Sequence, residues 1–278
     1  MKTMFRRVLT TASLLLCFST DALSCGLVNF VAMPLDQNLR TNPIKAALET
    51  AYPGLSVNDA NGFISFPNGE QVALGETRHQ MDPLQRLANP TVREQFLFVY
   101  PLGHDLESRK LEFNDPGRLR NDAFFRALYF GDKKSAQATL TRVKYKSKKV
   151  SKRFSVTTKN CVAVQLAAAL KEAAGSAAFE TYFRESGGSF SWRLISGTKR
   201  LSVHSFGAAI DIDPKLGQYW KWRNPKPGTS HVYKNKIPLG LVEIFEKYGF
   251  IWGGKWFHYD GMHFEYRPKL ILHSRLVS

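Results

Sequence analysis

The sequence of 278 residues has few cysteines and no second long apolar run after the one near its start. Only three Cys occur, and none belongs to the Cys-x-x-Cys pair of a redox centre or a structural zinc site. The His-Glu-x-x-His pattern of zincins and the Gly-x-Ser-x-Gly turn of serine hydrolases are also absent. These absences exclude a zinc ribbon and two widespread hydrolase signatures. Ample apolar content, 44% of residues, still predicts a folded core.

Residues 1–24 show the three regions of a secretory signal in their usual order. Basic side chains precede an apolar stretch from Val8 to Phe18, and Ala22-Leu23-Ser24 provides the small residues of a cleavage site. The stretch is too short to span a bilayer as a mature helix. We therefore expect an exported protein, periplasmic or extracellular, whose mature chain begins at Cys25 and has no transmembrane segment. The alternatives are a lipid-modified Cys25 and a frayed N-terminal helix.

Basic residues outnumber acidic ones by 39 to 23, which gives a formal net charge of +16, or +14 once the signal is removed. A basic exported protein is suited to the carboxylates and phosphates of cell-wall polymers. Nucleic acid is another polyanion, but export argues against it and no groove-reading motif is present. The densest basic stretch, residues 144–153, lies between β-type segments and predicts a solvated hairpin.

Two cysteines, Cys25 and Cys161, remain after removal of the signal, which contains Cys17. Two Cys in an oxidising compartment are more often paired than free, so we expect a disulfide between them. No catalytic pattern surrounds Cys161, which we interpret as structural.

The chain is expected to divide into an N-terminal region, residues 25–140, and a catalytic part, residues 141–278. Helical periodicity and stop signals predict helices over 42–52, from Asp115-Pro116 to near Gly131, over 162–174, and from Pro238 to Gly249. Short β-type runs lie at 62–66, 70–74, 190–195, 209–212, 250–252 and 263–266. Strands grouped around few helices predict an α+β fold: a small antiparallel sheet with flanking helices, to which the N-terminal region adds an α/β extension.

The first segment with candidate chemistry runs from Ser202 to Asp213. His204 lies in a turn that Gly207 can bend, and Asp211 follows in the apolar run Ala-Ala-Ile-Asp-Ile. A carboxylate in such a run is expensive to bury unless it is paired or metal-bound. The segment alone is consistent with two metal ligands or with a structural His–Asp hydrogen bond.

The second segment places His263 at the start of an aromatic strand, with Asp260 three residues before it. Two imidazoles and one carboxylate from His204, Asp211 and His263 would leave one zinc position to water, which is the open arrangement of catalytic sites. Asp260 could then take a proton from the attacking water and pass it to a leaving amine.

Ser-x-His-x-x-Gly-x-Ala-x-Asp at 202–211, followed by Asp-x-x-His at 260–263, resembles the zinc D-Ala-D-Ala carboxypeptidase family. That family includes vancomycin-resistance D,D-peptidases, phage L-alanyl-D-glutamate endolysins and the related Hedgehog signalling domain. The resemblance implies a small α+β domain with one zinc ion per chain, held by His204, Asp211 and His263.

The resemblance also implies roles for other residues. Asp260, where many members have Glu and the endolysins have Asp, would be the catalytic acid–base. Arg193 in Ser191-Trp192-Arg193 would steady the oxyanion or the substrate carbonyl. The substrate implied is a peptidoglycan stem peptide cut at an L-Ala–D-Glu or D-Ala–D-Ala type linkage, and Asp260 with the spacing of residues 195–198 favours the former. The resemblance covers roughly residues 185–268, and we assign no activity to residues 25–140.

Several neighbouring residues have plainer interpretations. His258 is expected at the surface, with a supporting or substrate contact as the alternative, and Glu265 is expected to orient a ligand. Four tryptophans either wall a substrate groove or pack in the core: Trp220, Trp222, Trp252 and Trp256.

Two other classes of function compete with a peptidase. One is a non-catalytic wall-binding or signalling module, because Hedgehog retains zinc without an established peptidase role. The other is a nucleic-acid-binding protein, which would show steeply salt-dependent duplex binding. The presence of Asp260 and Arg193 favours the enzyme, which we expect to be a monomer acting on peptidoglycan peptides.

Overall fold

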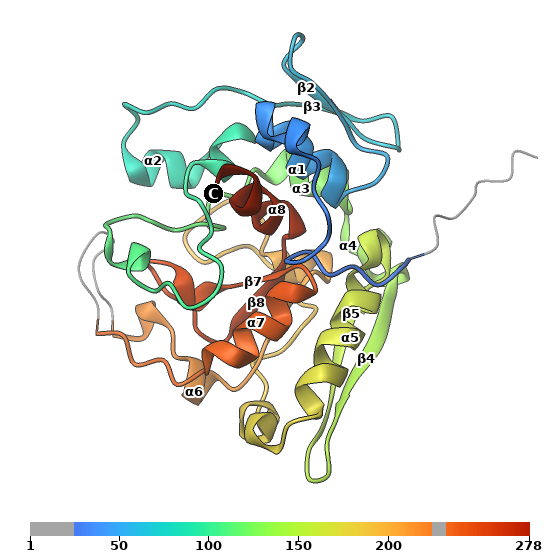
Figure 1. Ribbon diagram of the computed structural model, residues 1–278, viewed down its shortest axis with the longest axis vertical. Coiled ribbons are helices and arrows are strands. Elements are labelled where there is room, and N and C mark those ends of the chain that lie inside the picture. The colour runs from blue at the N-terminus through green and yellow to red at the C-terminus, as the bar shows by residue number, and fades with distance from the viewer. Residues whose placement is uncertain (1–24, 224–231) are drawn as a thin grey trace, which may run out of the picture.

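The sheet at the centre of the molecule carries the segments that the sequence analysis singled out (Figure 1). The computed structural model describes residues 25–223 and 232–278, so the expected signal lies outside the described residues. In this sheet β8 (His263–Tyr266) lies between β6 (Ala209–Asp211) and β7 (Phe250–Trp252), and both pairings are antiparallel. Every side chain of the three strands is buried. The α+β fold with a small antiparallel sheet is therefore confirmed.

Two helices predicted from periodicity cover this sheet and the hairpin beside it. Helix α7 (Leu239–Lys247) packs on β7, and α5 (Val162–Ala174) packs on α7 and on strand β4. Helix α7 is followed by Gly249 at φ +89, where a Cβ would collide with the Tyr266 ring. Glycine is required there, because both the left-handed backbone and the close ring exclude a side chain.

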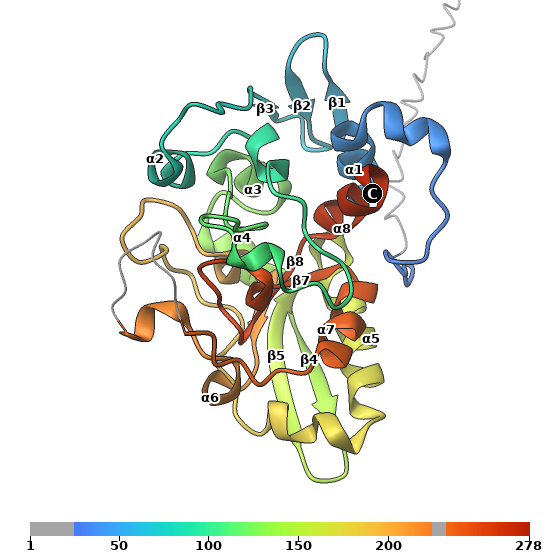
Figure 2. The same ribbon diagram turned by 60° about the vertical axis from the view of Figure 1, so that its left-hand side comes forward.

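A long hairpin carries the basic stretch. Strands β4 (Leu140–Lys146) and β5 (Ser151–Thr157) pair antiparallel, with Lys144 opposite Arg153. Apolar side chains such as Val143 alternate with exposed cations, so one face packs on α5 and the other faces solvent. The prediction of a solvated hairpin is confirmed, and the hairpin projects from the body of the molecule in both views (Figures 1 and 2).

The N-terminal region packs around helix α8 (Pro268–Val277), which itself contacts strand β7 of the central sheet. Its elements are α1 (Pro43–Ala51), β1 (Ser56–Asn58), β2 (Phe63–Ser65), β3 (Gln71–Ala73), α2 (Pro83–Ala88), α3 (Asp122–Leu128) and α4 (Lys133–Ala138). Helix α1 lies on α8 (Pro268–Val277), as Figure 2 shows. The buried apolar side chains of both parts form one cluster. The boundary near residue 140 stays a prediction.

A buried ion pair fastens the N-terminal region to the central sheet. The fully buried Lys255 ammonium donates to the carbonyls of Pro101 and Gly103 and to the Glu246 carboxylate at 2.6 Å. The Tyr100 hydroxyl also donates to Glu246 and accepts from the backbone N–H of Trp252. Because these hydrogen bonds satisfy both Lys255 and Glu246, the two buried charges are compensated where the N-terminal region meets the central sheet.

Two predicted elements are wrong. No helix opens at Asp115-Pro116: α3 begins at Asp122, with Asn121 as its cap, because Gly117 at φ +115 interrupts helical backbone. Residues 190–195 form no strand, and only Leu194 makes an isolated bridge. The N–H groups of this segment bond to several different partners instead of one neighbouring strand.

Helix α8, the three short helices α2, α4 and α6 (Pro214–Gly217), and strand β1 were not predicted. The remaining predicted helices and strands are present, and no helix of the described part of the chain is both long and apolar enough to cross a membrane.

The expected disulfide joins Cys25 to Cys161, two positions 136 apart in the sequence, with Cα atoms 5.4 Å apart. It ties the first described residue to the start of α5. Cross-linking so long a loop removes conformational freedom from the unfolded chain.

Replacing both cysteines by serine should lower the free energy of unfolding by about 2–5 kcal/mol. Denaturant titration of the mature chain measures this change, and reductant should reproduce it in the native protein but leave the Cys25→Ser/Cys161→Ser variant unaffected. Two free thiols in the denatured, unreduced mature protein would contradict the pairing.

Candidate metal centre

His204 is aimed by a tight turn at the base of the central sheet. The turn is the short helix Val203–Phe206, closed by Gly207 at φ +65, where a Cβ would lie 2.8 Å from the backbone nitrogen of Thr157. The Nδ1 atom of His204 lies 2.6 Å from the carbonyl oxygen of Ser189, to which it donates. That bond leaves Nε2, directed at the neighbouring sheet, as the nitrogen available to the other residues of the centre or to a metal ion.

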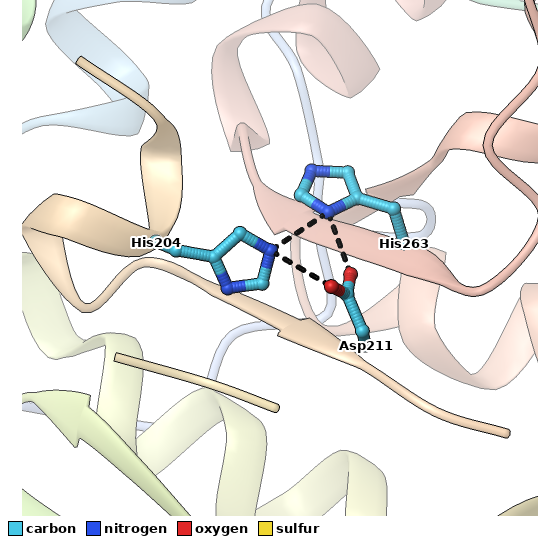
Figure 3. A group of neighbouring side chains, drawn as sticks. All are labelled: His204, Asp211 and His263. Atoms are coloured by element: carbon cyan, nitrogen blue, oxygen red, sulfur yellow. Dashed lines mark hydrogen bonds and ion pairs between the residues drawn. The ribbon is translucent and has the colours of Figure 1, made fainter. Parts of the chain in front are cut away.

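Asp211 and His263 meet His204 because their strands are paired. The register of β6 and β8 places Asp211 directly opposite His263, and His263 Nδ1 lies 2.9 Å from one carboxylate oxygen. His204 Nε2 lies 3.2 Å from the other carboxylate oxygen and 3.2 Å from His263 Nδ1 (Figure 3). Gly187 lies against this carboxylate side chain so closely that a Cβ there would be 2.6 Å from the Cβ of Asp211.

The three side chains have the chemistry and spacing of a zinc site. One ligand atom from each lies within 4.8 Å of the others, and all three residues are buried. Two imidazole nitrogens and a carboxylate oxygen are a common donor set for zinc, and three protein ligands leave one position open. The donor set therefore fits the ion that the sequence pattern implies.

Charge within the cluster is balanced by close contacts. Burial would raise the pKa of Asp211, but the positive charge of His204 and the hydrogen bonds from both imidazoles hold that pKa well below its usual range. Burial would lower the pKa of His263, and the hydrogen bonds to Asp211 and Glu265 outweigh it, which raises the pKa to about 9. Asp211 is thus an anion that attracts a cation into the centre.

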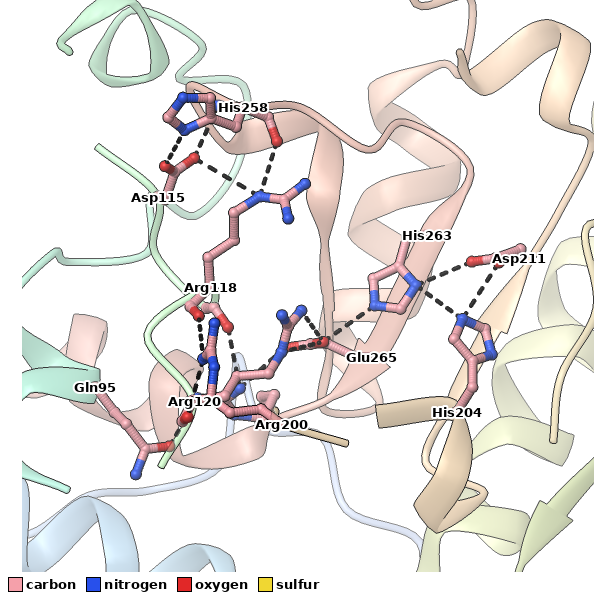
Figure 4. Close-up of polar contacts among 12 residues, drawn as sticks. Gln95, Asp115, Arg118, Arg120, Arg200, His204, Asp211, His258, His263 and Glu265 are labelled. Atoms are coloured by element: carbon pink, nitrogen blue, oxygen red, sulfur yellow. Dashed lines mark hydrogen bonds and ion pairs between the residues drawn. The ribbon is translucent and has the colours of Figure 1, made fainter. Parts of the chain in front are cut away.

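Glu265 fixes the ring of His263 from behind. Its Oε2 lies 3.0 Å from His263 Nε2, and the same oxygen accepts from Arg120 at 2.6 and 3.1 Å (Figure 4). Its Oε1 accepts from Arg267 at 2.9 Å. Burial raises the pKa of Glu265, but Arg120 and its other partners hold it far below its usual range. The expected contact of Glu265 with a ligand is present, and it leaves His263 Nδ1 for the metal.

Asp260 lies in the same cleft as the three clustered residues without belonging to the cluster. The cleft has a volume of about 290 Å³, and Asp260, His204, Asp211 and His263 all line it. The buried Oδ1 of Asp260 has no hydrogen-bond partner among the described residues. Burial raises the pKa of Asp260; the charge of His263 opposes this shift and that of Asp211 adds to it. An unpartnered buried carboxylate oxygen is a group that calls for an explanation.

Arg193 also reaches this cleft. Its backbone is fixed because its N–H donates to the hydroxyl of Ser205 at 2.9 Å and its carbonyl accepts from the same hydroxyl. The side chain is exposed at the rim and lines the cavity together with Asp260. The structure thus brings every residue that the sequence analysis assigned to the site into one cleft.

The surface position expected for His258 is wrong. The ring is 2% exposed, its Nδ1 lies 2.6 Å from Asp115, and its backbone N–H donates to the same carboxylate (Figure 4). The loop that carries Asp115 covers this part of the catalytic segment, a contact that no local pattern indicates.

The four tryptophans divide between core and cleft. Trp252 is fully buried in the core, Trp256 is fully buried but borders the metal-site cleft, Trp220 borders an adjoining cavity, and Trp222 is exposed. Arg118 and Arg120, which also line the cleft, come from outside the segment covered by the resemblance.

A buried His-Asp-His cluster, an open cleft and a carboxylate with one unpartnered oxygen are the parts that a metal-dependent hydrolase site requires. Residues 196–266 match the family model of D-alanyl-D-alanine carboxypeptidase. The match contains the three clustered residues and Asp260, and it confirms the resemblance to this peptidase family for the C-terminal part of the chain. Neither a search of curated proteins nor a search of solved structures gave a match.

Arg120 should matter for metal binding although it lies outside the family match. Removing its guanidinium in Arg120→Met leaves Glu265 with one cationic partner fewer, so His263 is held less firmly and zinc affinity should fall about 10- to 100-fold. Competition with a chromogenic chelator measures this affinity. Arg120→Lys keeps the charge but loses the two-pronged contact, so its zinc affinity should lie between those of the native protein and Arg120→Met.

The matched control is Arg126→Met, which breaks a partly exposed ion pair with Asp122 and should leave zinc affinity unchanged. A folded Arg120→Met protein with the affinity of the native protein would show that Glu265 orients His263 without Arg120.

Proposed function

We propose that this chain is an exported zinc peptidase that cleaves stem peptides of peptidoglycan. The observation that carries the proposal is the shared cleft, which is lined both by the buried His204–Asp211–His263 cluster and by Asp260, whose Oδ1 has no hydrogen-bond partner among the described residues. The family match to a D-alanyl-D-alanine carboxypeptidase supports the reaction class. The disulfide supports export, because disulfides persist in oxidising compartments.

Zinc would be held by Nε2 of His204, Nδ1 of His263 and a carboxylate oxygen of Asp211. Bound there, it would acidify water and polarise the carbonyl of the bond to be cut. The protein's contribution is to keep the two imidazoles in the required tautomers, through Ser189 on one side and Glu265 on the other.

Asp260 is the proposed general base. Its Oδ1 is free to take the proton of the attacking water and to return it to the leaving amine. Burial raises its pKa, which makes the carboxylate a better proton acceptor at neutral pH than an exposed Asp. An exposed Arg193 guanidinium at the rim would donate to the carbonyl oxygen as negative charge develops on it.

The substrate bond follows from the resemblance. The family match names a D-alanyl-D-alanine carboxypeptidase, whereas an Asp at position 260 favours an L-Ala–D-Glu linkage. A wall-binding or signalling module without catalysis is the second candidate. The free oxygen of Asp260 and the position of Arg193 in the cleft favour the enzyme, because catalysis needs a proton acceptor and an oxyanion partner beside the metal site.

Asp260→Asn and Asp260→Ala should retain zinc and fold but lose peptide cleavage by about 100-fold or more, since a positioned proton-transfer group contributes that much. Mass spectrometry of muropeptides incubated with zinc-loaded protein measures the cleavage and identifies the bond.

Asp213→Asn is the matched control for loss of an acid near the site. Asp213 caps the short helix α6 (Pro214–Gly217), and Asn caps helices equally well, so its activity should remain near that of the native protein. Near-native cleavage by both Asp260 variants with zinc retained would remove Asp260 from the mechanism.

A further inference from the structure

A second cavity opens beside the metal-site cleft. It has a volume of about 250 Å³, and part of its wall comes from residues 84–120, outside the segment that matches the peptidase family. The two cavities adjoin, and six residues line both of them: Arg118, Arg120, Ile195, Ser196, Tyr219 and Lys221. These shared residues lie next to the space in which a substrate at the metal centre would sit.

The wall of the second cavity combines basic and apolar side chains. Four cations line it, Arg118, Arg120, Arg200 and Lys221, and none of the described residues of its wall is an Asp or Glu. Apolar side chains of the wall include Leu84 and Leu87. A wall of this composition suits an anionic group carried on a short, partly apolar segment.

Arg118 is held rigidly, yet part of its hydrogen-bonding capacity is unused. Its Nε donates to the carbonyl of His258 at 2.8 Å (Figure 4). Its guanidinium lies over the ring of Trp256, 4.6 Å from the ring centre. Its Nη2 is buried without a hydrogen-bond partner within the described part of the chain. The carboxylate of Asp115 is 3.9 Å from Nε, and it already accepts from His258.

The two neighbouring arginines are engaged elsewhere. Arg120 makes its two-pronged contact with Glu265. Arg200 donates to the backbone carbonyl of Arg120 at 3.0 Å and so supports the segment that carries Arg118. Burial, and then the positive charge of Arg120, lowers the pKa of Arg200 to about 10, which reflects the excess of cations at this place. Arg118 is therefore the arginine best placed to take an external anion.

We propose that Arg118 binds a carboxylate of the peptide substrate in the second cavity, so that residues 25–140 complete the substrate site. The inference rests on the proposed peptidase function. Both candidate linkages leave a free α-carboxylate on the residue that follows the bond to be cut, because D-Glu is linked through its side chain and the last D-Ala is a chain end. A planar guanidinium matches a carboxylate with two parallel hydrogen bonds.

A different role for Arg118 makes different predictions. The positive charge of Arg118 also lowers the pKa of Asp260. If that were its whole contribution, Arg118→Gln would lower kcat and shift the pH profile equally for peptides with and without the carboxylate. A carboxylate-binding role instead raises KM for the acidic peptide alone.

The test is binding of matched acid and amide peptides to the full mature chain. Zinc-loaded Asp260→Asn protein, which does not consume the ligand, is titrated calorimetrically with L-alanyl-D-glutamate and L-alanyl-D-isoglutamine, and with the acid and amide of acetyl-D-alanyl-D-alanine. The acid of at least one pair should bind about 10- to 100-fold more tightly than its amide, as expected for hydrogen bonds to a charged group. Adding Arg118→Gln should abolish the preference, and Arg118→Lys should retain part of it.

Lys199→Gln is the charge-matched control, because Lys199 is exposed and lines neither cavity. It should leave the acid preference intact. Three results would overturn the inference. Arg118→Gln could leave the acid preference unchanged, neither pair could show a preference, or none of the four peptides could bind.

Cleavage assays separate this inference from the proposed function. If the native protein cleaves stem peptides and Arg118→Gln leaves KM for the acid unchanged, the peptidase stands and the carboxylate site fails. If no peptide is cleaved but the acid preference depends on Arg118, the carboxylate site is supported and the proposed peptidase function is contradicted.

Discussion

Glu265 is a carboxylate with no exposed surface, and its two oxygens accept hydrogen bonds from three side chains, those of His263, Arg267 and Arg120. Burying an ionised carboxylate costs several kcal/mol unless cationic partners with good geometry surround it. Arg120 and Arg267 supply that compensation, and His263 uses the remaining contact. The position of the His263 ring is thereby coupled, through Glu265, to the charge of Arg120, which lies 145 positions before Glu265 in the chain.

The coupling explains why the segment that matches the peptidase family is only part of the working unit. Residues 196–266 contain Glu265 but neither of its arginine partners. Arg267 immediately precedes α8 and donates to Gln95 of the N-terminal region, while α1 packs on α8. The N-terminal region thus helps to hold the strand that carries His263, and through Arg118 it lines the cleft in which the substrate would lie.

Local patterns identified His204, Asp211 and His263 as candidates, and the resemblance to the peptidase family joined them into one site, a grouping that the pairing of β6 with β8 produces. Local patterns were sufficient for α5 and α7, whose ends carry glycine and whose faces are periodic. Helix α8 was missed because it is buried on nearly all sides and so lacks an amphipathic pattern. His258 was misplaced, and Arg118 was overlooked, because their contacts join positions about 140 residues apart. Sequence reasoning fails where a polar side chain is explained by a distant partner.

The central claim is that one zinc ion is bound by two histidines and one aspartate with an open position toward the cleft. Anomalous diffraction at the zinc edge from crystals of the mature protein tests it directly. We expect a single peak at about 2.0–2.2 Å from Nε2 of His204, Nδ1 of His263 and a carboxylate oxygen of Asp211, which are the usual distances for these ligands. Asp260 should face the open side without touching the metal. The proposed zinc site would be contradicted by a peak elsewhere, by the lack of a peak in zinc-supplemented crystals, or by a fourth protein ligand that closes the site.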